Sequence, residues 1–79
     1  MTYVYILQSL ADMERRYVGL TNNLRARLAR HNAGQVAHTS KFIPWRVQSY
    51  FAFSDADRAV AFERYLKSSS GRAFARKRL

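Results

Sequence analysis

The sequence contains no cysteine, which excludes disulfide bonds and thiolate metal sites and fits a reducing compartment. No apolar run approaches the roughly 20 residues that a membrane-spanning helix needs. The amino terminus lacks the charged and apolar segments of a secretory signal. With one proline and three glycines, no repeat, linker or low-complexity segment divides the chain. We therefore expect residues 1–79 to form one cytoplasmic domain that does not bind a membrane.

Acidic residues are also scarce: five Asp and Glu stand against fourteen Lys and Arg, so the formal net charge is +9. Hydrophobic residues nevertheless make up 48% of the chain, and aromatic residues 14%, which is too apolar for a disordered basic tail. A chain of this length buries about 60% of its unfolded surface, enough for one small core. The composition indicates a folded domain whose partner is a polyanion.

Three stretches rich in β-branched and aromatic residues predict β-strands, at residues 3–7, 16–20 and 45–53. The first stretch is continuously apolar, which is typical of a strand buried on both faces. A short, mostly polar segment separates it from the second stretch, and this arrangement predicts an antiparallel hairpin.

Helices are predicted between and after these strands. Residues 21–23 supply capping side chains for a helix over residues 24–32, and Gly34 stands where its carboxyl-terminal cap belongs. Residues 35–43 predict a loop or a short irregular helix. A capping box opening at Ser54 begins a helix to about Lys67, and residues 72–77 predict a last short helix. The order β-β-α-β-α-α predicts an α+β fold, a three-stranded antiparallel sheet flanked by helices.

Polar residues occupy apolar faces of two predicted helices. At about 100° per residue, Arg27 and His31 share the stripe of Leu24 and Leu28 that should face the core. Burying such groups costs free energy unless they find partners. One interpretation is an arginine that reaches past the core edge and a hydrogen-bonded core histidine. The other is a functional cleft.

Glu63 repeats this pattern on the helix predicted to end near Lys67, where it lies beside the apolar stripe of Ala59, Phe62 and Leu66. A buried carboxylate is rare unless it is paired or binds a metal. A salt bridge to an arginine would explain Glu63 by itself. A cleft shared with Arg27 and His31 explains all three residues in one step.

Tyrosines accompany these groups. Tyr3 and Tyr5 are two residues apart and share one face of their strand, and Tyr17 lies on the neighbouring strand. They fit as ordinary core aromatics. A phenol near a metal and an arginine can also transfer a proton.

Two short motifs, Tyr3-Val4-Tyr5 and Tyr17-Val18-Gly19, resemble the half-motifs that name the GIY-YIG nuclease superfamily. The similarity continues through residues 23–28, 31–34, 44–45, 63–67 and 70–74, and so covers nearly the whole chain. It is greatest to the small bacterial single-domain members and extends to the amino-terminal nuclease domain of UvrC. Tyr3 replaces the glycine of the first half-motif, Ser69 replaces a glycine of close relatives, and Leu20 replaces a lysine of the UvrC domain.

The resemblance implies the α+β fold above and endonuclease chemistry on DNA with one divalent cation, Mg²⁺ or Mn²⁺. It implies that Glu63 binds the metal and that Arg27 is the catalytic arginine. His31 falls where the family has a His or Tyr near the nucleophile. Tyr5 and Tyr17 match the tyrosines of the two half-motifs, and either phenol would take the proton from the attacking water. DNA repair and recombination are the expected contexts.

Other basic residues are expected to follow the phosphate backbone of DNA. We assign this role to Arg25, Arg30, Lys41, Arg46, Lys67 and Arg72. Two alternatives stay open: a non-catalytic nucleic-acid-binding module of the same fold, and a nuclease that needs a protein partner for target recognition. Metal-dependent cleavage of DNA would identify an enzyme, whereas the non-catalytic module would bind DNA without cleaving it.

Overall fold

The computed structural model describes residues 1–79, and its centre is a three-stranded antiparallel sheet. The strands are β1 (Thr2–Ser9), β2 (Arg16–Thr21) and β3 (Trp45–Phe53), in the spatial order β2-β1-β3. Tyr5 in the central strand lies opposite Gly19 on β2 and Tyr50 on β3. Residues 4–7 are at most 1% exposed, as the continuous apolar run predicts for a strand covered on both faces.

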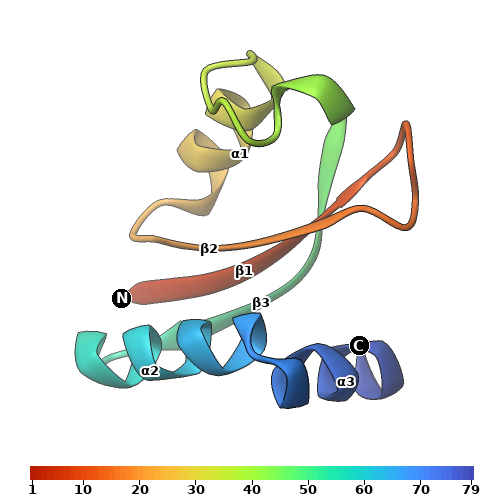
Figure 1. The fold of residues 1–79 in the computed structure, drawn as a ribbon. Helices are drawn as coiled ribbons and strands as arrows, with labels where there is room; N and C mark the ends of the chain where they lie inside the picture. The colour runs from red at the N-terminus through yellow and green to blue at the C-terminus, as the bar shows by residue number, and fades with distance from the viewer.

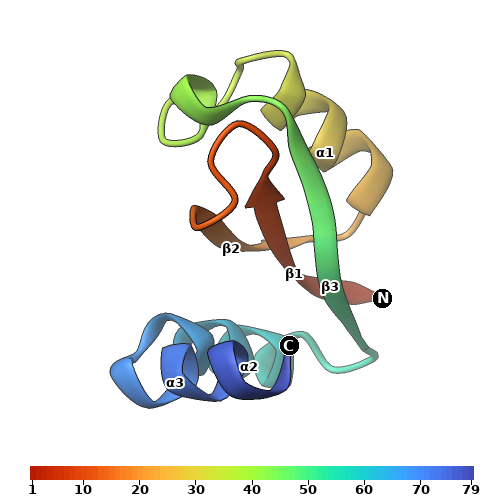
Figure 2. The ribbon, with the colours of Figure 1, turned by 90° about the vertical axis from the view of Figure 1, so that its right-hand side faces the viewer.

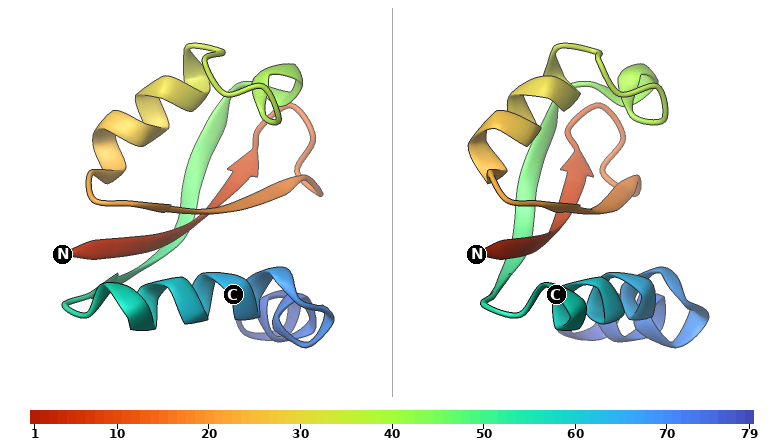
Figure 3. Two further views of the ribbon diagram at one scale, coloured as in Figure 1. Left: turned by 60° about the vertical axis from the view of Figure 1, so that its left-hand side comes forward. Right: turned by 90° about the vertical axis from the view of Figure 1, so that its left-hand side faces the viewer.

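Helices cover both faces of the sheet, so the molecule has three layers (Figures 1 and 2). One layer holds α1 (Leu24–Asn32) and the short 3-10 turn Ser40–Phe42. The other holds α2 (Ala56–Lys67) and α3 (Ser69–Arg78), which follow one another beneath the sheet (Figure 3). The α+β architecture and the order β-β-α-β-α-α are confirmed. No helix combines the length and the apolar character that crossing a membrane requires.

The ends of α1 follow the local chemistry of the sequence. The Asn23 side chain accepts a hydrogen bond from the Ala26 amide at 3.0 Å, which satisfies one free N–H of the first turn. Beyond the last turn, Gly34 adopts φ +76°, a conformation that costs glycine little, and its amide donates to the His31 carbonyl. These two caps fix where α1 stops and therefore hold His31 in its final turn.

The predicted start of α2 is wrong by one residue. Asp55, rather than Ser54, caps the helix, because its carboxylate accepts from the amides of Asp57 at 2.9 Å and Arg58 at 3.4 Å. Asp and Ser are about equally good caps, so the pattern alone does not separate them.

The last helix is also longer than predicted, since α3 begins at Ser69 and not at residue 72. Ser68 alone separates α2 from α3, and its hydroxyl accepts from the Gly71 amide at 3.2 Å. A Cβ at Gly71 would overlap the Tyr65 carbonyl, so glycine permits the close approach of the two helices. Ser68 is therefore the cap of α3, and Ser69 and Ser70 belong to its first turn.

Candidate active site

Three aromatic side chains from three elements meet on the face of the sheet that α1 covers. Tyr5 comes from β1, Tyr17 from β2 and His31 from the last turn of α1. The ring centroids of Tyr17 and His31 are 5.0 Å apart, those of Tyr5 and His31 5.9 Å, and those of Tyr5 and Tyr17 6.3 Å. The two half-motif tyrosines and His31 therefore form one cluster.

Gly19 makes room for this cluster. It lies opposite Tyr5 in the β1–β2 ladder, and a Cβ on it would come within 2.6 Å of the Tyr5 ring carbon Cζ. Gly19 does not have a positive φ, so the requirement is for space rather than for an unusual backbone. The phenol of Tyr5 lies across β2 because its partner in that strand has no side chain.

A chain of hydrogen bonds orients His31, which is completely buried. The Thr39 hydroxyl donates to the Val36 carbonyl at 3.3 Å, so its oxygen accepts from Nδ1–H of His31 at 2.8 Å. Nε2 of His31 then carries the lone pair and accepts from the Tyr5 hydroxyl at 3.0 Å. Trp45 holds Thr39 in place by donating from Nε1 to its carbonyl at 2.9 Å.

The charges around the cluster favour these protonation states. Burial lowers the pKa of His31 from 6.5, and the nearby charges of Arg27 and Arg30 lower it further. Burial, with the neighbouring Tyr17 and Glu63, raises the pKa of Tyr5 to about 12, although the Arg27 guanidinium opposes the shift. At neutral pH the cluster therefore holds a neutral imidazole and a protonated phenol.

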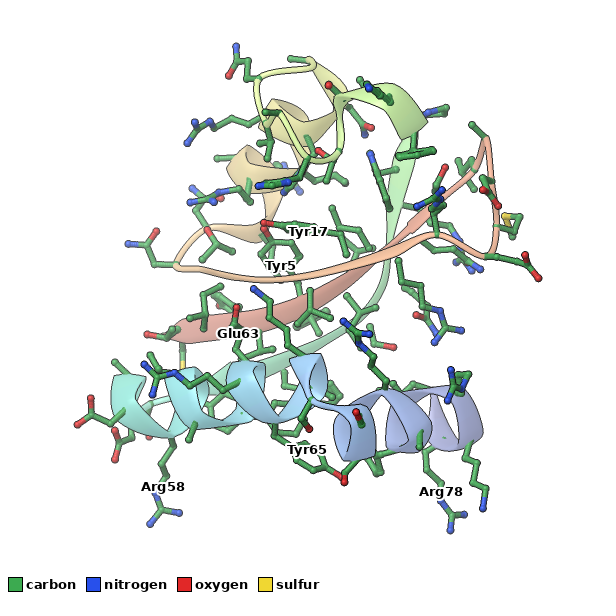
Figure 4. The ribbon with its side chains drawn as sticks, viewed as in Figure 1. Tyr5, Tyr17, Arg58, Glu63, Tyr65 and Arg78 are labelled. Carbon is green, nitrogen blue, oxygen red and sulfur yellow. The ribbon has the colours of Figure 1, made fainter.

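Arg27 and Glu63 approach the cluster from opposite sides of the sheet. Arg27 lies half-buried on α1, one turn before His31. The Glu63 side chain is 14% exposed and extends from α2 toward the sheet, below Tyr5 and Tyr17 (Figure 4). Because Glu63 contributes to the raised pKa of Tyr5, the two groups are within electrostatic reach of one another. The carboxylate also pairs with Lys67 at 2.6 Å, so its salt bridge is to a lysine and not to an arginine.

The basic residues assigned to DNA do not all lie together. Arg25, Arg30 and Lys41 are exposed in the α1 layer. Arg46 donates twice to the Gln8 side chain, at 2.6 and 3.1 Å, so its guanidinium already has a partner in the protein. Lys67 and Arg72 line a groove of about 670 Å³ between the β1–β2 hairpin and the helices α2 and α3.

Glu63 is the residue of this site with the chemistry to hold a divalent cation. The structure contains no group of three or more His, Cys, Asp or Glu side chains that would enclose a metal ion. Mg²⁺ does not need one, because it retains several waters and often binds through one or two carboxylates together with substrate phosphates. A single, largely buried carboxylate beside a basic groove fits such a cation.

Sequence patterns missed Thr39, which supports His31 from behind. Thr39 lies in the segment predicted as a loop or irregular helix, eight residues beyond its imidazole partner. Its 1% exposure is the structural sign of its role, and the local sequence carries no comparable signal. The contact depends on how residues 33–39 turn back beneath α1.

Comparison with known proteins gives one clear result. The chain matches the family model of the GIY-YIG catalytic domain over residues 1–78. No curated protein gave a significant match. The match includes every residue of the aromatic cluster, together with Arg27 and Glu63.

Proposed function

This chain belongs to the GIY-YIG family of nucleases, and from that premise we propose that it is a metal-dependent endonuclease that hydrolyses phosphodiester bonds in DNA. The observation that carries the proposal is the buried hydrogen bond between Tyr5 and His31, close to the charges of both Arg27 and Glu63. The net charge of +9 suits a polyanionic substrate.

Tyr5 is the phenol whose own proton has a hydrogen-bond acceptor. In the proposed step, the Tyr5 oxygen takes a proton from the attacking water while its own O–H proton passes to Nε2 of His31. The water oxygen forms the new bond to phosphorus, and the bond to the leaving oxygen of the strand breaks. His31 is then an imidazolium whose Nδ1–H stays bonded to Thr39. Its lowered pKa favours rapid loss of that proton to the leaving oxygen or to solvent.

Tyr17 has a different part in this proposal. Its ring packs over both Tyr5 and His31 and is half-buried, whereas Tyr5 is 1% exposed. Tyr17 therefore forms the wall between the proton relay and the solvent, where it would orient the attacking water. No hydrogen bond joins the Tyr17 hydroxyl to His31, so its proton has no comparable acceptor.

Arg27 would bind the scissile phosphate. Its guanidinium stays charged at every relevant pH and presents several donors in one plane, which matches phosphate oxygens. The positive charge of Arg27 lowers the pKa of Tyr5, so the guanidinium is within electrostatic reach of the phenol. A phosphate bound there is held beside the proton acceptor.

Glu63 would hold the divalent cation, Mg²⁺ or Mn²⁺. When bound, such a cation stabilises negative charge on the phosphoryl and leaving oxygens. In the structure Lys67 neutralises this carboxylate, and the Lys67 side chain is 51% exposed. The lysine can therefore release Glu63 and turn toward a phosphate of the bound strand.

We extend the proposal to DNA repair or recombination in the cytoplasm, with a protein partner that selects the target. The resemblance to the nuclease domain of UvrC supports the repair context.

A plasmid-nicking assay tests the enzymatic proposal. Wild-type protein should convert supercoiled plasmid to the open-circular form with Mg²⁺ or Mn²⁺, and EDTA should stop the reaction. Glu63→Gln should keep the fold and DNA binding but lose cleavage by about 10²-fold or more, because it removes the charge that holds the cation. Asp57→Asn is the matched control, since it makes the same chemical change at an exposed position of the same helix.

Cleavage by Glu63→Gln at the wild-type rate would contradict the role of the carboxylate. DNA binding by the wild type with no cleavage under any metal would instead favour the non-catalytic binding module. The pairing of Glu63 with Lys67 would then be a purely structural salt bridge.

A further inference from the structure

The groove beside the active site is the one substantial hollow of the molecule. It lies between the β1–β2 hairpin and the helices α2 and α3, on the opposite side of the sheet from α1, and its volume is about 670 Å³. Pockets of about 300–1,000 Å³ typically enclose a small organic ligand. The size suits one or two nucleotides.

The rim of this groove is strongly basic. Arg16, Lys67, Arg72 and Arg76 line it, and Glu14 is the single acid among its residues. All four cations are exposed. The side chains of the three arginines make no hydrogen bond or salt bridge within the protein, in contrast to Arg46. They are therefore free to bind an anion.

The floor of the groove is apolar. Ile6 and Val18 come from the sheet, and Leu66 and Ala75 from the two helices. Met13 adds a flexible, half-exposed side chain at the hairpin. Such a surface suits the flat faces of nucleic-acid bases, which bury apolar area against it.

Lys67 joins the groove to the proposed catalytic centre, because it lines the groove and pairs with Glu63. A strand whose scissile phosphate lies between Arg27 and Glu63 would therefore enter this groove on one side of the cut.

We propose that the groove binds an unpaired segment of the DNA strand immediately beside the scissile phosphate. Basic groups that follow the backbone, combined with surfaces for base stacking, are the features of single-strand binding, because only unpaired bases expose their faces. The inference rests on the proposed nuclease function, and it narrows the substrate to DNA that is single-stranded on at least one flank of the cut.

Equilibrium binding in EDTA tests the groove separately from cleavage. The probes are a fluorescent 12-nucleotide single strand and the duplex of the same sequence, measured by anisotropy over a range of salt concentrations. The wild type should bind the single strand more tightly. Arg72→Gln/Arg76→Gln should weaken that binding about tenfold and lower the slope of log Kd against log salt by about 1.4, or 0.7 for each lost phosphate contact.

The matched control removes the same amount of charge, from one position on α2 and one on α3 that lie outside the groove. Arg58 and Arg78 extend away from the groove, on the far side of α2 and α3 (Figure 4). Arg58→Gln/Arg78→Gln should leave the affinity for the single strand within about twofold, because only unspecific charge is lost. Glu14→Gln should have the opposite sign and tighten binding, since it removes the one acid of the groove.

Two results would overturn the proposal. Equal loss of affinity in the two double variants would show that only net charge matters. Tighter binding of duplex than of single strand, with Arg72→Gln/Arg76→Gln affecting both alike, would assign the groove to a duplex backbone. Neither result requires cleavage, so failure of the nuclease proposal remains a separate outcome.

Discussion

The two faces of the central sheet differ in what they bury. The face under α2 and α3 has a core of Val4, Ile6, Ala59 and Leu66, and its one buried polar atom without a partner is Oε1 of Gln48, whose amide donates to the Leu79 carbonyl at 2.6 Å. The face under α1 has a core of Tyr5, Leu7 and Trp45 and also the buried polar side chains of the protein. These are Ser9, Thr21, His31 and Thr39. The polar side chains that are fully buried therefore lie on the α1 side, with the aromatic cluster.

The buried polar groups on the α1 side cost little free energy of folding, because they have hydrogen-bond partners. Both ring nitrogens of His31 have partners, and the Ser9 hydroxyl donates to the Phe42 carbonyl at 2.6 Å. An unsatisfied buried polar group would cost about 1–3 kcal/mol. Glu63 is the one residue that approaches the cluster from the α2 side of the sheet. It does so where α2 passes beneath β2, the edge strand in which Gly19 has no side chain.

Adjacent residues of β1 give the sharpest test of this comparison, because Val4 and Tyr5 point to opposite faces. Tyr5→Phe should lower the rate of DNA cleavage about 10²–10⁴-fold, since it removes the proton acceptor. Its free energy of unfolding should fall by about 1–3 kcal/mol, because the change leaves the buried Nε2 of His31 without a hydrogen-bond donor. Single-turnover cleavage and urea denaturation measure the two quantities.

Val4→Ala should change the stability of the protein without changing its cleavage rate. It should lower the free energy of unfolding by about 2 kcal/mol, through lost burial and a cavity, while the folded protein cleaves DNA at the wild-type rate. Tyr17→Phe should lose about tenfold in rate. A larger loss in Tyr17→Phe than in Tyr5→Phe would make Tyr17 the proton acceptor.

Thr39→Val tests whether the polar face depends on the orientation of His31. The variant keeps the shape but leaves Nδ1–H without a partner, so the histidine loses the constraint on its tautomer. We expect the cleavage rate to fall about tenfold, with DNA affinity unchanged. Nitrogen-15 NMR of the imidazole should show a mixture of tautomers in place of one.

Thr39→Ser is the control, because it restores the hydroxyl and should restore both rate and spectrum. If Thr39→Val retained the single tautomer and the wild-type rate, Thr39 would be a packing residue only.

The smallest expected effect is that of pH on stability. Because the pKa of His31 is lower in the folded protein than 6.5, the unfolded chain binds the proton first. This contribution to stability is complete above pH 6.5 and is lost as the pH falls through the lowered pKa. Arg27 and Arg30 face the ring with positive charge, and the facing Tyr5 phenol is neutral there, so none of these groups reverses the sign.

For Tyr5 the direction is opposite, because its pKa is raised from 10.0 to about 12. Its contribution is complete below pH 10 and is lost as the pH rises toward 12.

Urea denaturation from pH 5 to pH 8 tests the contribution of His31. The free energy of unfolding should rise with pH in the wild type, and His31→Gln should reduce that slope. An equal slope in both proteins would assign the acid effect to other groups.

Local patterns predicted much of this structure. The apolar run at residues 3–7, the caps around α1 and the aromatic stretch at residues 45–53 each depend on neighbours in sequence, and these elements are confirmed. The helical positions of Arg27, His31 and Glu63 likewise follow from 3.6 residues per turn. Periodicity identifies a face, but it does not identify the group that covers that face.

The sequence by itself determined the strands, the helices and which polar residues turn inward, because these follow from backbone geometry over a few residues. Only the tertiary structure decided that Thr39 holds His31, that Lys67 neutralises Glu63, and that arginines from the hairpin and α3 border one groove. The reason is that each such contact needs two segments whose separation is set by the packing of the layers, which no local pattern encodes.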